Sequence, residues 1–413
     1  MKNTRLGALA AALSVSALLL SACGSDNNTA ATTTTSSTQP ATTSAQVSTP
    51  EPASSSADSS APSSASGGSS APSAGSGQPS TGAGPTFEGA GFTCATGELR
   101  SSGSTAQGKA IGKWITDYNA KCGAKVGDYG GGGSGKGVTD FIAKQTDFGG
   151  SDSALKDDQF TKAKDRCAGS DAIDLPMVTG PIAIAFNVKG VDKLVLTPKV
   201  LVGIFGGQIA VWNDPQIAAL NPGVTLPASP ITTVHRAEES GTTDNFTKYL
   251  TAAGGWTFEG GKAWTAPGGQ AEQGNDGVGK AVAATDGAIG YVEWGFAKDN
   301  NLHMAAIDNG SGPVELTAES AGKAVEAATV VGTGKDLALK LDYATKEAGA
   351  YPLILVTYEI VCSAGNSADT APLLKSFLGY TATDGQTTLA ELGAAPLPAS
   401  IQQQVIASAS SIS

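Results

Sequence analysis

The chain has 413 residues, a formal net charge of -11 at pH 7 and a sequence pI of about 4.7. This acidity argues against nucleic acid and against an anionic lipid surface as the main partner. It does not exclude a small anion, because backbone N–H groups, hydroxyls and one arginine at helix N-termini can bind an anion regardless of the global charge.

The N-terminus has the pattern of a lipoprotein signal peptide. Lys2 and Arg5 precede an uncharged apolar run over residues 6–20, and Leu20-Ser21-Ala22-Cys23 follows. Small residues before a cysteine are typical of a lipobox, so we predict a signal peptide and lipobox over residues 1–23, with lipid (palmitate among its chains) attached to Cys23. A transmembrane helix is the alternative, but the run is shorter than the roughly 20 apolar residues that span a bilayer.

Residues 24–86 consist mainly of Ser, Thr, Ala, Pro and Gly and contain no Lys or Arg. Such a composition has almost no apolar surface to offset the entropy of ordering the backbone. We therefore predict a disordered linker between the lipid anchor and the folded part of the chain.

Residues 87–413 are long enough for two domains of ordinary size. Strands and helices alternate in the first half of this region: strands are predicted over 97–100, 124–129 and 172–188, and helices over 110–120 and 137–146. Alternation of this kind predicts an α/β fold with mainly parallel sheets flanked by helices. The ligand sites of such sheets lie at the carboxyl ends of the strands.

Three loops that lead into helices are rich in small polar residues, over 101–105, 130–135 and 236–242. One such loop is usually only a helix N-cap, but three of them indicate a shared anion site. Residues 130–136 also match most of a P-loop, except that Gly137 replaces the hydroxyl residue that would bind magnesium. We therefore predict a phosphate nest without nucleotide chemistry, with Lys136 facing solvent.

Besides Cys23 the chain has four cysteines, without C-x-x-C spacing. In an oxidising compartment an even number favours disulfides over a metal site. Four cysteines allow three pairings, of which we favour Cys94–Cys122 and Cys167–Cys362, because the first two flank one strand-helix unit.

His235 and His303 are the only histidines, and neither stands in a recognisable triad or zinc motif. We expect no metal, no cofactor and no catalysis. An extracellular phosphatase stays an alternative, although no nucleophile-base spacing or two-metal carboxylate cluster is apparent.

From about Leu99 to the C-terminus the chain resembles the phosphate-specific binding proteins of the Pst ABC transporter. The resemblance rests on ordered sequence pieces: Asp147-Phe148-Gly149-Gly150-Ser151-Asp152, Gly203-Ile204-Phe205-Gly206-Gly207, Val211-Trp212-Asn213-Asp214, Leu220-Asn221-Pro222-Gly223, His235-Arg236-Ala237-Glu238-Glu239-Ser240-Gly241-Thr242, Gly274-Asn275-Asp276-Gly277 and Ala288-Ile289-Gly290-Tyr291-Val292.

The resemblance implies the two-lobed fold of periplasmic binding proteins, with a hinge that closes over phosphate. Together with the chain pattern it places lobe one at 87–179 and 352–413, and lobe two at 180–351. The phosphate ligands it implies are Thr105, the N–H of Ala106, Ser134, Asp152, Arg236, Ser240, Gly241 and Thr242. Two features depart from the family: Thr105-Ala106-Gln107 stands where Thr-Phe-Pro is common, and the glycine run before Ser134 is longer than usual.

The function implied is that of a monomeric lipoprotein, held on the outer face of the cell membrane, which binds inorganic phosphate and delivers it to the permease subunits of an ABC importer. Asp152 favours phosphate, because an ionised carboxylate accepts a hydrogen bond from a protonated oxyanion and repels unprotonated sulfate, and Arg236 offsets the charges of both. A helix cap before Ala154-Leu155 is the structural alternative for Asp152. Binding of another oxyanion such as sulfate, or phosphate sensing without transport, stays open as a function.

Overall fold

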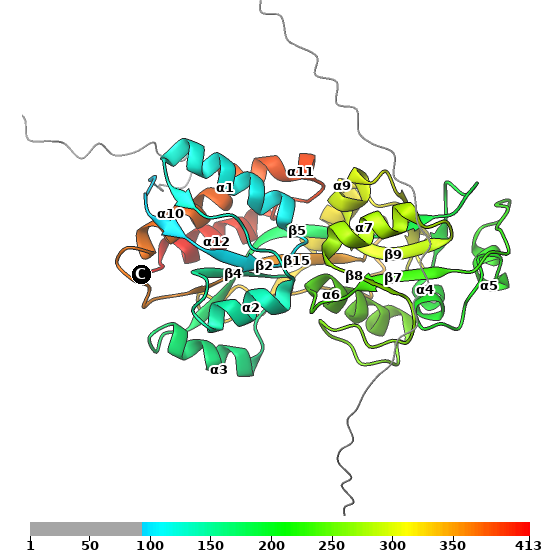
Figure 1. Ribbon diagram of the computed structural model, residues 1–413, viewed down its shortest axis with the longest axis horizontal. Helices are drawn as coiled ribbons and strands as arrows, with labels where there is room; N and C mark the ends of the chain where they lie inside the picture. The colour runs from blue at the N-terminus through cyan, green and yellow to red at the C-terminus, as the bar shows by residue number, and fades with distance from the viewer. Residues whose placement is uncertain (1–92) are drawn as a thin grey trace, which may run out of the picture. The chain divides into compact units, whose positions relative to one another are not determined.

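The computed structural model describes residues 93–413 (Figure 1). The predicted signal peptide, Cys23 and the linker over 24–86 lie outside the described residues. Within residues 93–413, no helix combines the length and the apolar character needed to cross a membrane.

An eight-stranded mixed sheet organises this part of the chain, with the order β2-β4-β15-β5-β9-β7-β8 and with β10 paired to β5. Its strands are β2 (Ser101–Gly103), β4 (Phe148–Ser151), β5 (Ala172–Asn187), β7 (Thr232–Arg236), β8 (Gln270–Glu272), β9 (Ala288–Glu293), β10 (His303–Met304) and β15 (Ile354–Cys362). A short parallel pair, β1 (Glu98–Leu99) with β3 (Lys125–Val126), lies outside this sheet.

The α/β prediction is confirmed, but the prediction of mainly parallel sheets is wrong for the centre of the sheet. Strand β5 pairs antiparallel with β15 over Ala172–Pro181 and antiparallel with β9 over Ile182–Asn187. Parallel pairs occur only toward the two edges, between β2 and β4 and between β7 and its neighbours β8 and β9. The chain leaves the first half of the fold on β5 and returns on β15, so two adjacent strands must run in opposite directions.

The apolar side chains form two large cores that divide the chain at the middle of β5. One contains residues between Leu99 and Val178 and between Val361 and Ile412 together with Leu337, and the other contains residues between Ile182 and Leu355 together with Ala106. The predicted lobe bounds stay a prediction, and the division of the cores falls close to them.

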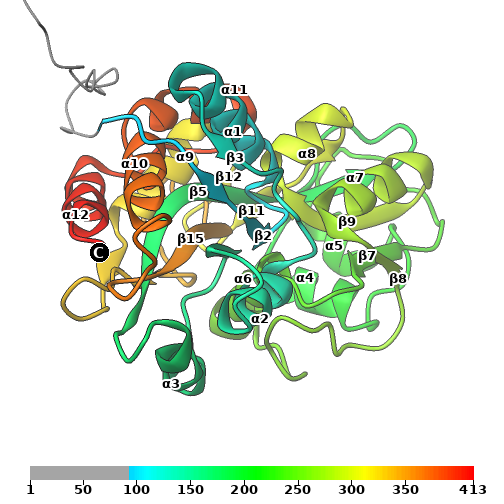
Figure 2. The same cartoon turned by 60° about the vertical axis from the view of Figure 1, so that its left-hand side comes forward.

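Helices cover both halves of the sheet, and in two views α1, α10 and α12 gather on one half while α4 and α7 gather on the other (Figures 1 and 2). The helices of the first half are α1 (Gly108–Cys122), α2 (Ser134–Ile142), α3 (Asp157–Arg166), α10 (Ala371–Thr381), α11 (Leu389–Leu392) and α12 (Ala399–Ser410). Those of the second half are α4 (Pro198–Phe205), α5 (Pro215–Leu220), α6 (Gly241–Tyr249), α7 (Gly274–Ala284), α8 (Trp294–Asp299) and α9 (Ala318–Glu326).

Helix α1 shows how closely the local pattern determines an element. Ile111, Trp114, Ile115 and Tyr118 recur at helical spacing and are all buried. The helix ends at Gly123, whose φ of 63° is a left-handed conformation that glycine adopts without strain.

Two disulfides connect distant parts of the first half. Cys94 bonds to Cys122 at the end of α1, and Cys167 after α3 bonds to Cys362 at the end of β15. The pairing that we favoured from the sequence is therefore confirmed.

Candidate anion-binding site

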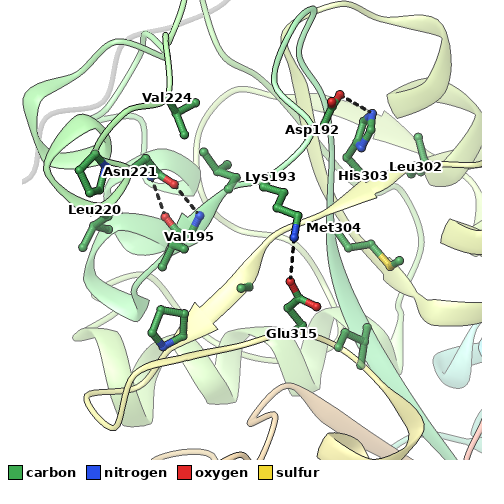
Figure 3. A pocket seen from close by; sticks show the side chains of 15 residues that line it. Asp192, Lys193, Val195, Leu220, Asn221, Val224, Leu302, His303, Met304 and Glu315 are labelled. Carbon is green, nitrogen blue, oxygen red and sulfur yellow. Dashed lines mark hydrogen bonds and ion pairs between the residues drawn. The ribbon is translucent and has the colours of Figure 1, made fainter.

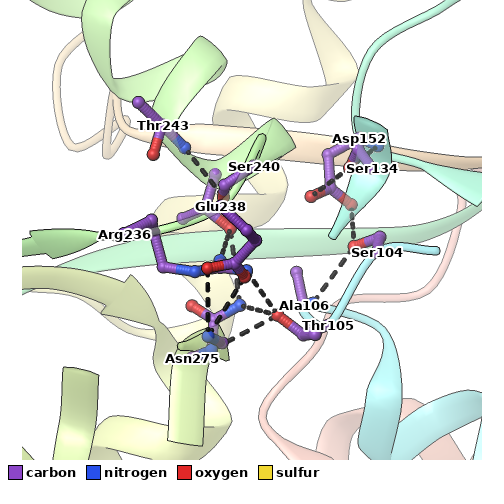
Figure 4. A network of polar contacts seen from close by, with 12 residues as sticks. Ser104, Thr105, Ala106, Ser134, Asp152, Arg236, Glu238, Ser240, Thr243 and Asn275 are labelled. Carbon is purple, nitrogen blue, oxygen red and sulfur yellow. Dashed lines mark hydrogen bonds and ion pairs between the residues drawn. The ribbon is translucent and has the colours of Figure 1, made fainter. Parts of the chain in front are cut away.

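The three polar loops follow the carboxyl ends of β2, β3 and β7, where the strand-end rule predicts a site. The loop after β2 carries Thr105 into α1, the glycine-rich loop carries Ser134 into α2, and the loop after β7 leads to α6. Ser240 caps α6, because its hydroxyl accepts a hydrogen bond from Thr243 N at 3.2 Å. The side chains from these loops approach one another and form a network of polar contacts (Figure 4).

Asp152 is buried at the centre of the first-half side of this network. Its Oδ1 accepts hydrogen bonds from the hydroxyls of Ser104 and Thr357, the latter at 2.7 Å, and its Oδ2 accepts one from Ser134 at 3.2 Å. Burial is the main influence on its pKa and raises it, while these hydroxyls and the charge of Arg236 act in the opposite direction. The carboxyl group is thus surrounded by donors that suit an acceptor.

The alternative role of Asp152, a helix cap before Ala154-Leu155, is wrong. The next helix, α3, begins at Asp157, and its N-cap residue is Lys156. Both carboxyl oxygens of Asp152 bond to hydroxyls of residues distant in the sequence, which no capping function requires.

Arg236 supplies the positive charge of the site, and its side chain is only 1% exposed. Its Nη2 donates to Thr105 Oγ1 at 2.9 Å and forms an ion pair with Glu238, and its Nη1 donates to Thr242 Oγ1 at 3.3 Å. The buried Nε has no partner among residues 93–413. A buried guanidinium N–H without an acceptor is costly, and an anion would satisfy it.

Two side chains that the sequence analysis missed hold this arginine and its neighbours. Glu238 pairs with Arg236 and also accepts the N–H of Gly274 at 3.0 Å, at the start of α7. The Nδ2 of Asn275 donates to Thr105 Oγ1 at 3.2 Å and to Thr242 Oγ1 at 3.4 Å. Glu238 therefore offsets the charge of Arg236.

The two sides of the site are in direct contact. A Cβ atom at Gly241 would lie 2.4 Å from Ser134 Oγ and 2.6 Å from Asp152 Oδ2, so only glycine fits there. The N–H of Gly135 donates to the carbonyl of Glu239 at 3.1 Å. Ser134, Asp152 and Gly241 therefore meet at one point of contact between the halves, and hydrogen bonds join Thr105, Arg236 and Thr242.

Three of the expected backbone donors are engaged elsewhere. The N–H of Ala106 donates to Ser104 Oγ at 3.1 Å, within its own loop. Within the predicted phosphate nest at 130–136, the N–H groups of Gly130 and Gly133 donate to carbonyls of β2 at 2.9 Å each. The glycine-rich loop runs along β2 and contributes the Ser134 hydroxyl instead. Lys136 is half exposed and pairs with Asp140, in agreement with its predicted solvent-facing position.

Among residues 93–413, no group of three or more His, Cys, Asp or Glu side chains could hold a metal ion. His235 stacks on Trp264, with ring centroids 5.1 Å apart. A pocket of about 700 Å³ lies elsewhere, between β10 and the small sheet of β6 (Val195–Leu196), β11 (Ala306–Asp308) and β12 (Pro313–Val314) (Figure 3). Its lining residues include the pairs Lys193–Glu315 and His303–Asp192, and none of the predicted ligands lines it.

Comparison with known proteins decides the family. A family model described as a PBP superfamily domain matches residues 28–384. The phosphate-binding protein PstS 3 of Mycobacterium leprae (strain TN) is 43% identical over 320 residues, which cover 76% of this chain and 86% of that protein. PstS 2 of Mycobacterium tuberculosis (strain ATCC 25618 / H37Rv) is 43% identical over 330 residues, covering 76% and 87%. The chain belongs to the PstS family.

Solved structures confirm the fold of this PstS family member. A high-affinity periplasmic phosphate-binding protein called PfluDING has a TM-score of 0.62 at 22% identity, over 75% of this chain and 93% of that one. A substrate-binding protein of a putative phosphate ABC transporter from Clostridium perfringens has a TM-score of 0.54 at 17% identity, over 73% and 100%. At these sequence identities the structural similarity shows the fold alone, and it supports the predicted binding-protein architecture.

Four residues of the PstS site lay outside the ligand set taken from the resemblance. Ser104 and Glu238 stand in the same loops as Thr105 and Arg236, and Asn275 falls in a motif already noted, so the sequence contained a signal for each. Thr357 lies in a long apolar strand, 205 positions from its partner Asp152, and no local pattern identifies it.

Proposed function

We propose that this protein binds inorganic phosphate between the two halves of its fold and delivers it to the permease subunits of an ABC importer. The proposal rests on one observation: a buried acceptor and a buried donor come from opposite halves of the fold. Asp152 offers carboxyl oxygens from one half, and Arg236 offers an unpaired Nε–H from the other. The curated relatives are phosphate-binding proteins, which supports the same ligand and a binding rather than a catalytic activity.

The ligands of this proposal are Thr105, Ala106, Ser134, Asp152, Arg236, Ser240, Gly241 and Thr242. Phosphate at neutral pH keeps a proton that Asp152 accepts, while its other oxygens take hydrogen bonds from the guanidinium and the hydroxyls. Sulfate carries no such proton and meets Asp152 as acceptor against acceptor, which explains a preference for phosphate.

Phosphate is expected to stabilise and compact the protein. A ligand that binds only the folded state adds RT ln(1 + [L]/Kd) to the free energy of unfolding, or about 2.7 kcal/mol at one hundred times Kd. Thermal unfolding of residues 93–413 should therefore shift upward with phosphate, and small-angle scattering should give a smaller radius of gyration than for a phosphate-free sample. Sulfate at the same concentration is the control. Equal shifts with both anions would contradict phosphate selectivity, and no shift with either would contradict the proposed function.

Lipid attachment at Cys23 would place the protein outside the cytoplasm, tethered by its linker to the membrane that holds the permease. The Cys23→Ala variant lacks the thiol that accepts the lipid, so it should appear in the soluble fraction, whereas the unaltered protein should sediment with membranes. Phosphate binding should be the same in both, because the altered residue lies far outside residues 93–413. Equal partitioning of the two proteins would contradict the lipid anchor, and incorporation of labelled palmitate provides an independent readout.

A further inference from the structure

A second carboxyl group, Glu359, lies beneath the first-half side of the site. It follows Thr357 by two positions on β15, and both side chains lie near Asp152. Thr357 bonds to Asp152, and Glu359 stands opposite Gly150 of β4, two positions before Asp152. Glu359 is completely buried.

The acceptor atoms around Glu359 lack a hydrogen-bond donor. Neither of its carboxyl oxygens has a partner among residues 93–413, and neither has the amide oxygen of Gln107, which is also buried. The other end of that amide donates from Nε2 to the hydroxyl of Tyr129 at 3.1 Å. Three buried acceptors without a donor are unfavourable, but a proton on Glu359 would provide one.

These side chains connect the segments that carry the site. Gln107 follows Thr105 in the loop that leads into α1, and Tyr129 begins the glycine-rich loop that leads to Ser134. Both pack on β4 where a side chain is missing: a Cβ atom at Gly150 would lie 2.1 Å from the Tyr129 hydroxyl and 2.3 Å from Gln107 Nε2. The position of this network therefore determines the position of both loops relative to Asp152.

The surroundings favour the neutral acid. Burial, together with the charge of Asp152, raises the pKa of Glu359 to about 8, although the nearby amide of Gln107 acts to lower it. Tyr129, the other titratable group that faces it, has a pKa well above 10, chiefly through burial and then through the charge of Glu359. No cation is among the groups that shift the pKa of Glu359, so an ionised carboxylate would lie uncompensated beside Asp152.

We propose that Glu359, as a neutral carboxylic acid, is a positioning residue of the anion site: its proton bridges to Gln107 Oε1 and fixes the loops that carry Thr105 and Ser134. The inference rests on the proposed function, since phosphate binding reports it. Loss of the proton removes the bridge and adds a negative charge next to Asp152, so both effects weaken the binding of an anion.

The sign of the pH dependence follows. The protonated form binds phosphate better. The affinity for phosphate should therefore be highest below the pKa of Glu359 and fall as the pH rises through about 8. At pH 9 roughly one molecule in ten keeps the proton, so the apparent Kd for phosphate should rise by up to about tenfold between pH 7 and pH 9.

The test is calorimetric titration with inorganic phosphate at pH 7 and pH 9 for the wild type and for Glu359→Gln. The glutamine amide can donate to Gln107 Oε1 and does not titrate. This variant should therefore bind phosphate at pH 7 and should lack the additional loss of affinity that the wild type shows at pH 9. Ionisation of phosphate itself affects every variant equally and cancels from the comparison.

Glu293→Gln is the matched control. Glu293 is also completely buried, with a pKa raised by burial to about 8, but its carboxylate accepts the N–H of Gly295 and does not face Asp152. This variant should keep the alkaline loss of affinity. Lys262 needs a second control, because it bonds to Ser151 and burial lowers its pKa, so its deprotonation would also weaken anion binding.

An alkaline loss of affinity that persists in Glu359→Gln but disappears in Lys262→Met would overturn the proposal and assign the effect to Lys262. A wild type whose change in affinity between pH 7 and pH 9 equals that of Glu359→Gln would overturn it as well. If Glu359→Gln does not fold, the carboxyl carbon resonance of Glu359 in the wild type decides: a midpoint near 8 supports the proposal and one near 4 overturns it. Absence of phosphate binding at pH 7 in the wild type would instead contradict the proposed function.

Discussion

Replacing Arg236 with alanine is expected to weaken phosphate binding by a factor of about 100 or more. The guanidinium is buried, forms an ion pair with Glu238, and its charge also acts on Asp152. Truncating one partner of a buried, hydrogen-bonded charge pair costs about 2–5 kcal/mol of binding free energy, because the other charge is left unpaired, and each 1.4 kcal/mol corresponds to about a factor of ten in Kd. A bound oxyanion adds further negative charge, so every oxyanion should bind more weakly. Calorimetric titration with phosphate measures the effect.

Two controls separate the geometry of Arg236 from its charge. Lys136→Ala removes a half-exposed cation from the neighbouring glycine-rich loop, where it pairs with Asp140, and should change the Kd by less than about twofold. Arg236→Lys keeps the charge but not the planar fork that reaches Thr105, Thr242 and Glu238, so it should fall between the wild type and alanine. If Lys136→Ala weakened binding as much as Arg236→Ala, only the total charge would matter and the assigned geometry would be wrong.

Local sequence patterns predicted those features of the protein that depend on residues close together in the sequence. The apolar spacing of Ile111, Trp114, Ile115 and Tyr118 determines a helix whatever the rest of the fold does. The strand-end rule directed attention to the loops after β2, β3 and β7, which carry Thr105, Ser134 and Arg236, and each of these strands has a parallel neighbour, as the rule requires.

The features that the sequence analysis missed depend on contacts between distant strands. Thr357 and Glu359 are polar residues in a buried strand, and only the pairing of β15 with β4 and β5 reveals that they face the site. The glycine run shows the same limitation. Glycines suit both an anion nest and a segment packed closely along a strand, and only the bridge between Gly103 and Gly132 reveals the packing along β2.

Replacing Asp152 with asparagine should allow sulfate to compete with phosphate. The side chain keeps its size, but its amide can turn an N–H toward an unprotonated oxyanion oxygen and remove the clash between acceptors. The hydroxyls of Ser104, Ser134 and Thr357 that now donate to the carboxylate can rotate, since each also has acceptor capacity. A buried polar mismatch is worth a few kcal/mol, so the ratio of the Kd for sulfate to that for phosphate should fall at least about tenfold.

The matched control for this variant is Thr357→Val, which removes one donor to Asp152 Oδ1 and leaves the carboxyl group in place. It should weaken phosphate binding modestly, by about 1–3 kcal/mol at most, without admitting sulfate, because the acceptor that repels sulfate is retained. Competition of labelled phosphate with sulfate measures both variants at one pH. If Asp152→Asn still excludes sulfate while it binds phosphate, the discrimination lies in the donors of Ser134 and residues 240–242, whose spacing would then select the ligand by shape rather than by its proton.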